Sequence, residues 1–411
     1  MKRFLAIAAI LAVLLAGNAI LPRREYFSPR LYDIVIRAGI TIVLAVSLNL
    51  INGFTGQFSL GHAGFMALGA YMAGSLTYHF GMAWEQVLPV PAALSHALLF
   101  VVALLSSAML AALAGLLMGI PLLRLRGDYL AIATLGFGEI VGVLIRNLDF
   151  VGGSRGMPDV PAYTNFFWVY LAVVGVIVMV RNLAHSSHGR AFLSIREDEV
   201  AAEAMGIDTT RYKVLAFVIG SAWAGIAGGL YGHYVTVLHP DSFTFLQSIE
   251  LVVIVVLGGM GSILGSVVTA ALLKIIEEAL RSVEGAAVVF YLFILFDALL
   301  SYSRYRGRRG LFVVKLVAYT VLVTLGLLVG SDRFYPRLAA IASSFPELRS
   351  LIAAGHNWIA DNIGPLRGVF YALLLILLML TRPRGLFARS DTSSGWQAWL
   401  ARVRRREERV V

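Results

Sequence analysis

The 411-residue sequence contains no cysteine and few charged residues. Without cysteine, neither disulfide bonds nor thiol chemistry can contribute to stability or function. Charged residues make up only 14% of the chain, whereas ordinary soluble domains contain about a quarter. The apolar residues form long continuous runs, not the alternating segments of about ten residues that are typical of membrane barrels. The composition therefore predicts an all-α, polytopic helical membrane protein.

The sequence also lacks the motifs of several enzyme classes. It contains no GxxxxGK[ST] phosphate loop, no nucleophile elbow, no HExxH and no clustered metal ligands. The net charge of +10 does not indicate a nucleic-acid partner, because Lys and Arg cluster in short segments between apolar runs, as topology signals do. We therefore expect a protein that is not an enzyme, with no cofactor, no metal and no nucleic-acid partner, surrounded by a lipid bilayer.

Twelve apolar stretches are long enough, or nearly so, to cross a membrane, which predicts about 10–12 spans in one transmembrane domain over 1–411. The candidates are 4–21, 31–51, 61–80, 92–120, 129–148, 164–181, 213–235, 244–258, 262–280, 286–302, 312–330 and 366–381. The first could be a cleaved signal peptide. We favour a retained span, because the run is long enough to cross.

The distribution of basic residues predicts the orientation of the chain. If the N-terminus is cytoplasmic, the strongest Lys and Arg clusters fall on the cytoplasmic side, as the positive-inside rule requires. Only Arg23, Arg24 and Arg30 disagree with this orientation. Both termini are then cytoplasmic, and 382–411 forms a basic cytoplasmic tail. The segment 236–243, which has no Lys or Arg, lies outside.

A polar island from Arg181 to Lys213 separates two apolar stretches. Its core, 190–206, has the periodicity of one amphipathic helix, with charged residues opposite an apolar face. We place Ala191, Ile195, Ala202 and Met205 on that apolar face. A charged helix cannot lie in the bilayer core, so we expect a surface loop that a soluble partner can reach.

Small and polar residues are dense between Asn49 and Gly74. Broken helices occur at membrane depth only where protein or a water-filled cavity satisfies the freed backbone groups. The stretch therefore predicts a pathway lining that offers uncharged hydrogen bonds, and helix packing through small residues is the alternative. His62 by itself is more typical of a hydrogen-bonded packing residue than of a ligand. The candidate pathway residues are Asn49, Asn52, Thr55, Gln57, Ser59 and His62.

Two carboxylates lie within apolar runs, Glu139 and Glu250. An ionisable group at membrane depth is costly and marks a pathway or a proton relay by default. We therefore add Glu139 to the candidate pathway residues, with a pathway or gating role, and a broken or peripheral helix is the alternative.

Pairs of glycines four residues apart predict close helix packing. They occur at Gly225 and Gly229, at Gly228 and Gly232, and at Gly261 and Gly265.

Four blocks of the sequence resemble a known family. They are NLINGFTGQFSLGHAGFMALGAY (49–71), LRGDYLAIATLGFGEIV (125–141), 189–234, which begins GRAFLSIREDEVAAEAMGI, and HPDSFTFLQSIELVVIVVLGGMGSILGSVVTA (239–270). In these blocks, and in RPRGLF near the end, the chain is similar to the LivM-type permeases of branched-chain amino acid ABC importers. These permeases belong to the LivH/LivM/ribose-type superfamily.

The resemblance implies a subunit of a bacterial inner-membrane importer. Such permeases pair with a LivH-type permease, dock two cytoplasmic ATPases of LivG and LivF type, and receive substrate from a periplasmic binding protein. ATP hydrolysis would then occur in the partner subunits, which agrees with the missing phosphate loop. Residues of the third block resemble the loop on which ATPases act in ABC importers. The coupling candidates are Arg196, Glu199, Ala201, Ala202 and Gly206.

The sequence departs from the family over 281–365, which looks inserted and holds two extra apolar runs, 286–302 and 312–330. The usual substrate is therefore not assured. An importer of the same type for urea, short amides or aromatic acids is the alternative. An ion-coupled secondary transporter would require partnered membrane carboxylates and inverted repeats, and the sequence shows no internal repeat.

Overall fold

In the computed structural model, the described residues are 12–19, 21, 28–87, 91–122, 128–280, 291, 319–321, 324, 335–341, 350–355 and 357. Several predicted features lie wholly or mostly outside these residues: the spans 286–302, 312–330 and 366–381, and the tail 382–411; half of the span 4–21 also lies outside them. The chain divides into two compact units: the first comprises Met1–Ala271 and Arg382–Val411, and the second runs from Leu272 to Thr381. Each unit is described by itself.

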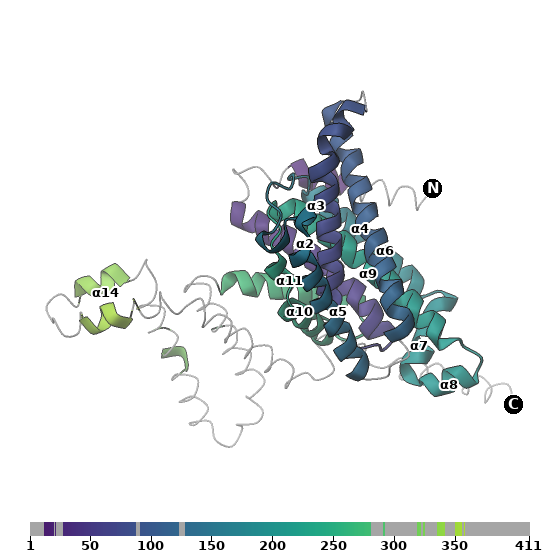
Figure 1. Cartoon of the computed structure of the whole chain (residues 1–411). Helices are drawn as coiled ribbons and strands as arrows, with labels where there is room; N and C mark the ends of the chain where they lie inside the picture. Colours follow the sequence, from purple (N-terminus) through teal and green to yellow (C-terminus); the bar gives the residue numbers. More distant parts are fainter. Residues whose placement is uncertain are drawn as a thin grey trace, which may run out of the picture. The chain divides into compact units, whose positions relative to one another are not determined.

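The regular secondary structure of the described residues is helical (Figure 1). The principal helices are α2 (Pro29–Asn49), α3 (His62–Val87), α4 (Ala92–Leu122), α5 (Asp128–Asn147), α6 (Phe166–Ala184), α7 (Ser187–Glu197), α8 (Glu199–Ala204), α9 (Thr209–Val235), α10 (Phe245–Gly258), α11 (Ile263–Ala279) and α14 (Tyr335–Ile341). Within the described part of the chain, six helical segments are long and apolar enough to cross a membrane. The predicted fold class, an all-α polytopic membrane protein, is confirmed.

Helix α2 continues into a π-helix, η1 (Leu50–Phe54), and together they form the most buried candidate span. The Ser28 hydroxyl accepts a hydrogen bond from the Leu31 N–H, and Pro29 occupies the first turn, so the sequence fixes the start of the helix. The second half of α2 is buried throughout against α6, α9 and α10. This central position holds the end of α2 inside the protein.

Helices α3, α4 and α9 pack closely through small residues (Figure 1). A Cβ atom on Gly69 of α3 would collide with the backbone of Gly225 of α9, and one on Gly228 would collide with the Met66 carbonyl. The Ser107 hydroxyl of α4 donates to the Gly69 carbonyl at 2.8 Å. The glycine pairs of α9 therefore mediate helix contact, as the sequence predicts.

The predicted single helix over 190–206 is wrong. Asp198 is extended (φ −159°, ψ 108°) and separates α7 from α8. Its carboxylate accepts hydrogen bonds from the N–H groups of Val200 and Ala201 at 2.9 and 3.0 Å. Because a short acidic side chain competes for free backbone N–H groups at a helix start, Asp198 begins a new helix instead of continuing α7.

One loop precedes α6 and another loop follows α9. Met157 and Leu238 exchange two backbone hydrogen bonds of 2.8 Å across these loops. Gly156 has φ +80°, and a Cβ there would collide with the Leu238 carbonyl, so the close approach requires glycine. The two loops are therefore tied together at one end of the first unit.

Candidate functional site

The chain leaves helical geometry between η1 and α3. We name residues 49–62 the polar break. Its residues 56–61 have no regular structure, and Gly56 has φ +68°, a conformation that favours glycine. Six of the seven predicted pathway residues lie in the polar break, and all six are buried: Asn49, Asn52, Thr55, Gln57, Ser59 and His62. The structure therefore places a set of uncharged polar side chains inside the helical core.

Asn49 ties the end of α2 to the turn between α10 and α11. Its Oδ1 accepts a hydrogen bond from the Gly261 N–H at 2.8 Å, and its Nδ2 donates to the Ser262 carbonyl at 3.1 Å. Gly261 has φ +82°, and a Cβ on Gly53 would collide with both Asn49 Oδ1 and Gly261 N. Asn49 therefore holds a tight backbone approach that a side chain at either glycine would prevent.

Other polar atoms of the polar break are buried and have no hydrogen-bond partner among the described residues. They are Asn52 Nδ2, Gln57 Nε2 and Oε1, Ser59 Oγ and His62 Nδ1. An unpaired buried donor or acceptor costs about 1–3 kcal/mol. Such groups in one short segment mark a place that accommodates water or a polar solute.

His62 is fully buried and hydrogen-bonded to α2. Its Nε2 lies 2.9 Å from Ser47 Oγ, and the Ser47 hydroxyl donates to the Leu44 carbonyl at 2.9 Å. The Ser47 oxygen then accepts from His62 Nε2–H, which leaves Nδ1 as an acceptor; we assign this tautomer from the hydrogen-bond network. His62 thus presents an acceptor in the polar break.

Residues of α5 and α10 complete the surroundings of the polar break. Thr134 Oγ1 accepts from the Leu60 N–H at 3.0 Å, and Ser248 Oγ accepts from the Ala63 N–H at 3.1 Å. Gln247 adds a buried Oε1 that has no partner among the described residues. We did not predict Thr134, Gln247 or Ser248, because a single polar residue in an apolar run gives no signal of which distant segment it contacts.

The seventh predicted pathway residue, Glu139, lies on an exposed face of α5. The structure does not bring it together with the buried residues of the polar break. Glu250 of α10 is partly buried. A pathway role for Glu139 stays a prediction.

In the polar island, Glu199 faces inward. Its carboxylate forms an ion pair of 2.6 Å with Lys213, whose side chain is only 7% exposed. Glu203 accepts a hydrogen bond of 2.7 Å from the hydroxyl of Thr209, the first residue of α9. These carboxylates fasten α8 to the start of α9.

The opposite face of α8 is exposed and largely apolar. Val200 and Met205 are 62% and 83% exposed, and Ala201 and Gly206 lie on the same surface. Gly206 has φ +82°, and no atom of the described residues lies within 4 Å of the position of a Cβ. Two coupling candidates, Ala201 and Gly206, are therefore exposed, whereas Ala202 is buried. The prediction that Met205 lies on the buried face is wrong.

Arg196, at the end of α7, connects the polar island to the polar break. Its Nη1 donates to the Gly53 carbonyl at 3.1 Å, and its Nε donates to the carboxylate of Glu197 at 3.2 Å. The side chain is 34% exposed. Arg196 thus joins an exposed carboxylate to a backbone carbonyl of η1.

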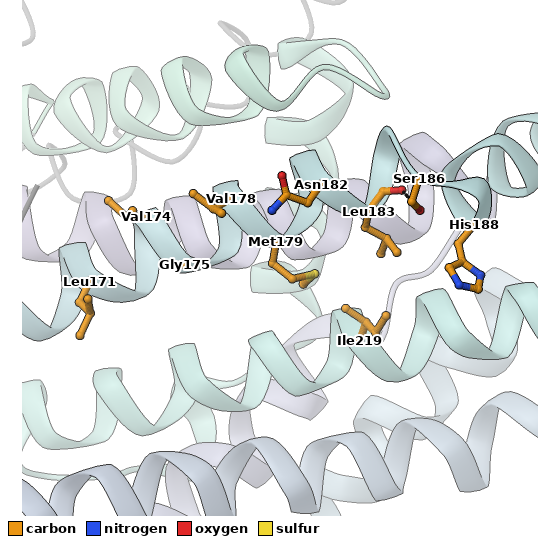
Figure 2. Close-up of a pocket in the computed structure, with 10 residues that line it drawn as sticks. All are labelled: Leu171, Val174, Gly175, Val178, Met179, Asn182, Leu183, Ser186, His188 and Ile219. Atoms are coloured by element: carbon orange, nitrogen blue, oxygen red, sulfur yellow. Dashed lines mark hydrogen bonds between the residues drawn. The ribbon is translucent and has the colours of Figure 1, made fainter. Parts of the chain in front are cut away.

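A mostly apolar groove of about 820 Å³ runs along α6. Figure 2 shows Leu171, Val174 and Val178 along this helix, with Ile219 of α9 across from it. Asn182, Ser186 and His188 supply polar groups toward α7. None of the predicted site residues lines the groove. Among the described residues, no group of three His, Asp or Glu side chains could hold a metal ion.

The model of the family "Branched-chain amino acid transport system / permease component" matches residues 30–302. The match includes 286–302, which the sequence analysis assigns to the inserted region. No solved structure matches the chain.

Curated relatives carry names of the same kind. The chain is 36% identical to the high-affinity branched-chain amino acid transport system permease protein LivM of Salmonella typhimurium, over 61% of this chain and 63% of the relative. It is 35% identical to the LivM protein of Escherichia coli over the same shares. It is 33% identical to the E. coli LivH permease, over 34% of this chain and 46% of the relative. The chain thus covers less than two thirds of the length of these relatives.

Proposed function

The chain belongs to the family of branched-chain amino acid transport system permease components, with LivM proteins among its relatives, and we propose that it is the membrane-spanning subunit of an ATP-driven importer of branched-chain amino acids. The observation that carries this proposal is the polar break, a buried segment of uncharged polar groups between membrane-spanning helices. The protein would lie in the bacterial inner membrane, with α7, α8 and both termini in the cytoplasm.

The polar break suits a transport pathway better than a tight binding site. The groups without a hydrogen-bond partner among the described residues are neutral donors and acceptors on Asn52, Gln57, Ser59 and His62. Conduction requires contacts that are favourable enough for entry and weak enough for release. Neutral groups provide such contacts to the polar ends of an amino acid, and a separate binding protein on the outer side would then set most of the specificity.

The exposed surface of α8 is the proposed contact for a cytoplasmic ATPase. Val200 and Met205 present apolar side chains to solvent on a helix that the Glu199–Lys213 ion pair fastens to α9. Closure of two LivG/LivF-type ATPases would push α8 and, through it, tilt α9. Alternating access of the polar break would follow from this rigid-body motion, together with a LivH-type partner permease.

Reconstitution tests the proposal. The chain is purified with its partner permease, two ATPases and binding protein, placed in proteoliposomes, and supplied with radiolabelled leucine. We expect uptake that requires ATP and stops with an ATPase that cannot hydrolyse it. Uptake that instead follows a proton gradient without ATP would contradict the proposal and favour an ion-coupled transporter. Competition by unlabelled urea, short amides or aromatic acids, in place of valine and isoleucine, would reassign the substrate.

A further inference from the structure

Three glycines surround the side chain of Arg196. A Cβ on Gly56 would lie 2.9 Å from Arg196 Cγ, and one on Gly261 would lie 3.0 Å from Arg196 Nη1. Gly53 supplies the carbonyl that accepts the hydrogen bond from Nη1. Gly56 and Gly261 both have positive φ, so their conformations also favour glycine. Gly53 and Gly56 of the polar break and Gly261 of the α10–α11 turn therefore form a close-packed site, which we name the socket, around the side chain of Arg196 from the polar island.

The chemistry of the socket explains why a guanidinium belongs there. Gly53 lies in the π-helix η1, and the chain leaves helical geometry after Phe54, so carbonyls of this last turn have no helical partner ahead of them. Such a carbonyl inside a membrane protein needs a donor. A cation is also favoured at the C-terminal end of a helix. Arg196 supplies a charge-assisted hydrogen bond to this broken end.

The same guanidinium forms an ion pair with Glu197, whose side chain is 71% exposed to solvent. Asp198 follows directly and begins α8, the helix with the exposed apolar surface. Only Glu197 and Asp198 therefore separate the start of α8, the helix that carries the surface proposed to contact an ATPase, from a side chain that touches the polar break. A displacement of α7 and α8 would pull Arg196 away from the Gly53 carbonyl.

We propose that Arg196 is the positioning residue that transmits ATPase movement to the pathway. This inference rests on the proposed function. With α7 as observed, Arg196 caps η1 and holds the polar break in its present conformation. When α7 and α8 move, the Gly53 carbonyl loses its donor and the polar break changes conformation. The device is a two-state contact between a cytoplasmic helix and the end of a broken membrane helix.

The test uses the complete importer in proteoliposomes with Arg196→Gln, Arg196→Lys and the control Arg190→Gln, since Arg190 is exposed on the same helix. A charge-assisted hydrogen bond is strong enough to shift a two-state equilibrium by about 10- to 100-fold. We expect Arg196→Gln to lower leucine uptake per ATP hydrolysed by about that factor while the ATPases still co-purify. Arg196→Lys keeps the charge and retains part of the coupling. Arg190→Gln matches the parent protein.

A conformational reporter separates transmission from a purely structural role. The chain has no cysteine, so Phe58→Cys, in the polar break and 39% exposed in the native chain, adds a single thiol. We expect ATP to change its rate of alkylation in the parent and in Arg190→Gln, but not in Arg196→Gln. If Arg196→Gln does not accumulate in the membrane, Arg196→Lys carries the same measurement, with a smaller ATP-dependent change expected.

Two results would overturn the inference. One is normal uptake per ATP together with a normal reporter response in Arg196→Gln. The other is loss of the ATPases from purified Arg196→Gln, which would place Arg196 in the ATPase interface instead. Failure of the proposed function is distinguishable, because the parent complex would then show no ATP-dependent uptake at all.

Discussion

At the residue scale, the Lys213 ammonium group lies where water cannot solvate it. Its partner carboxylate on Glu199 is 2.6 Å away, and the two side chains are 7% and 25% exposed. Removing one member of a buried ion pair leaves an uncompensated charge, whereas replacing both can be nearly neutral. The pair therefore sets how α8 is attached to α9, apart from any contact with an ATPase.

We predict that Glu199→Gln lowers the free energy of unfolding by about 3 kcal/mol. The double variant Glu199→Gln/Lys213→Met should recover much of this loss, because it removes the buried charge. Thermal unfolding in detergent, followed by circular dichroism, measures both. Equal unfolding temperatures for the parent and Glu199→Gln would show that the ion pair does not stabilise this junction.

Two polar residues of the polar break should respond in opposite ways to an apolar replacement. Asn49 makes two hydrogen bonds to the α10–α11 turn, whereas neither polar atom of the Gln57 side chain has a partner among the described residues. We predict that Asn49→Leu destabilises the protein by about 2 kcal/mol, because it leaves the Gly261 N–H unpaired and removes one of the donors to the Ser262 carbonyl, which keeps the Ser266 N–H. Gln57→Leu should preserve or raise stability and lower uptake. A large loss of stability in Gln57→Leu, with normal uptake per folded protein, would refute the pathway assignment.

At the element scale, the packing of α3 on α9 depends on glycine backbone approaching backbone. A Cβ on Gly228 would meet the Met66 carbonyl and the Ala70 amide, whereas no atom in the described part of the chain lies within 4 Å of such a position on Gly136 of α5. Both glycines lie within helices, but only the Gly228 position is crowded. Gly136 therefore serves as the control for a substitution at Gly228.

We predict that Gly228→Ala destabilises the protein by about 1–3 kcal/mol through overpacking. Gly136→Ala should be neutral or stabilise by up to about 1 kcal/mol, since alanine favours the helix more than glycine does. Unfolding temperatures of the two variants, purified side by side, provide the comparison. Equal losses in both would mean that contact with α3 does not limit position 228.

The exposed surface of α8 supports a prediction about assembly. Val200→Glu/Met205→Glu should prevent the ATPases from co-purifying, because charges would face an apolar contact surface. Both side chains are more than half exposed, so the stability of the permease alone should not change. Val200→Leu/Met205→Leu is the control that keeps the surface apolar. Retention of the ATPases by the glutamate variant would move the contact elsewhere.

At the scale of the whole molecule, α6 and α9 place the polar island and the Met157–Leu238 bridge at opposite ends of two apolar helices. We predict that Ser154→Cys, in the loop before α6, is labelled by an impermeant thiol reagent in intact cells. Thr210→Cys, at the start of α9, should be labelled only in inverted vesicles. Both native side chains are exposed, and the chain has no other cysteine to react. Labelling of both from the same side would contradict the topology.

The sequence predicts the helices far better than their contacts. Eight of the predicted spans, from 31–51 to 262–280, coincide with described helices, because membrane spanning requires long apolar runs that composition alone exposes. The concentration of polar residues likewise identifies the polar break. The backbone groups to which Asn49 and Arg196 form hydrogen bonds could not be predicted. These groups lie more than a hundred residues away along the chain, and every residue type has them, so the sequence does not single them out. The kink at Asp198 was missed because helical periodicity carries across a single extended residue.

The π-helix η1 within the polar break has a consequence for length. A π turn closes its hydrogen bond over one more residue than an α turn, so η1 contains one residue more than an α-helical turn would need. If that turn tightened to α geometry, the released residue would add about 3.3 Å to the extended chain before α3. The buried amide and hydroxyl groups of the polar break could then shift along the pathway by about the length of one residue, while α2 and α3 stay in place.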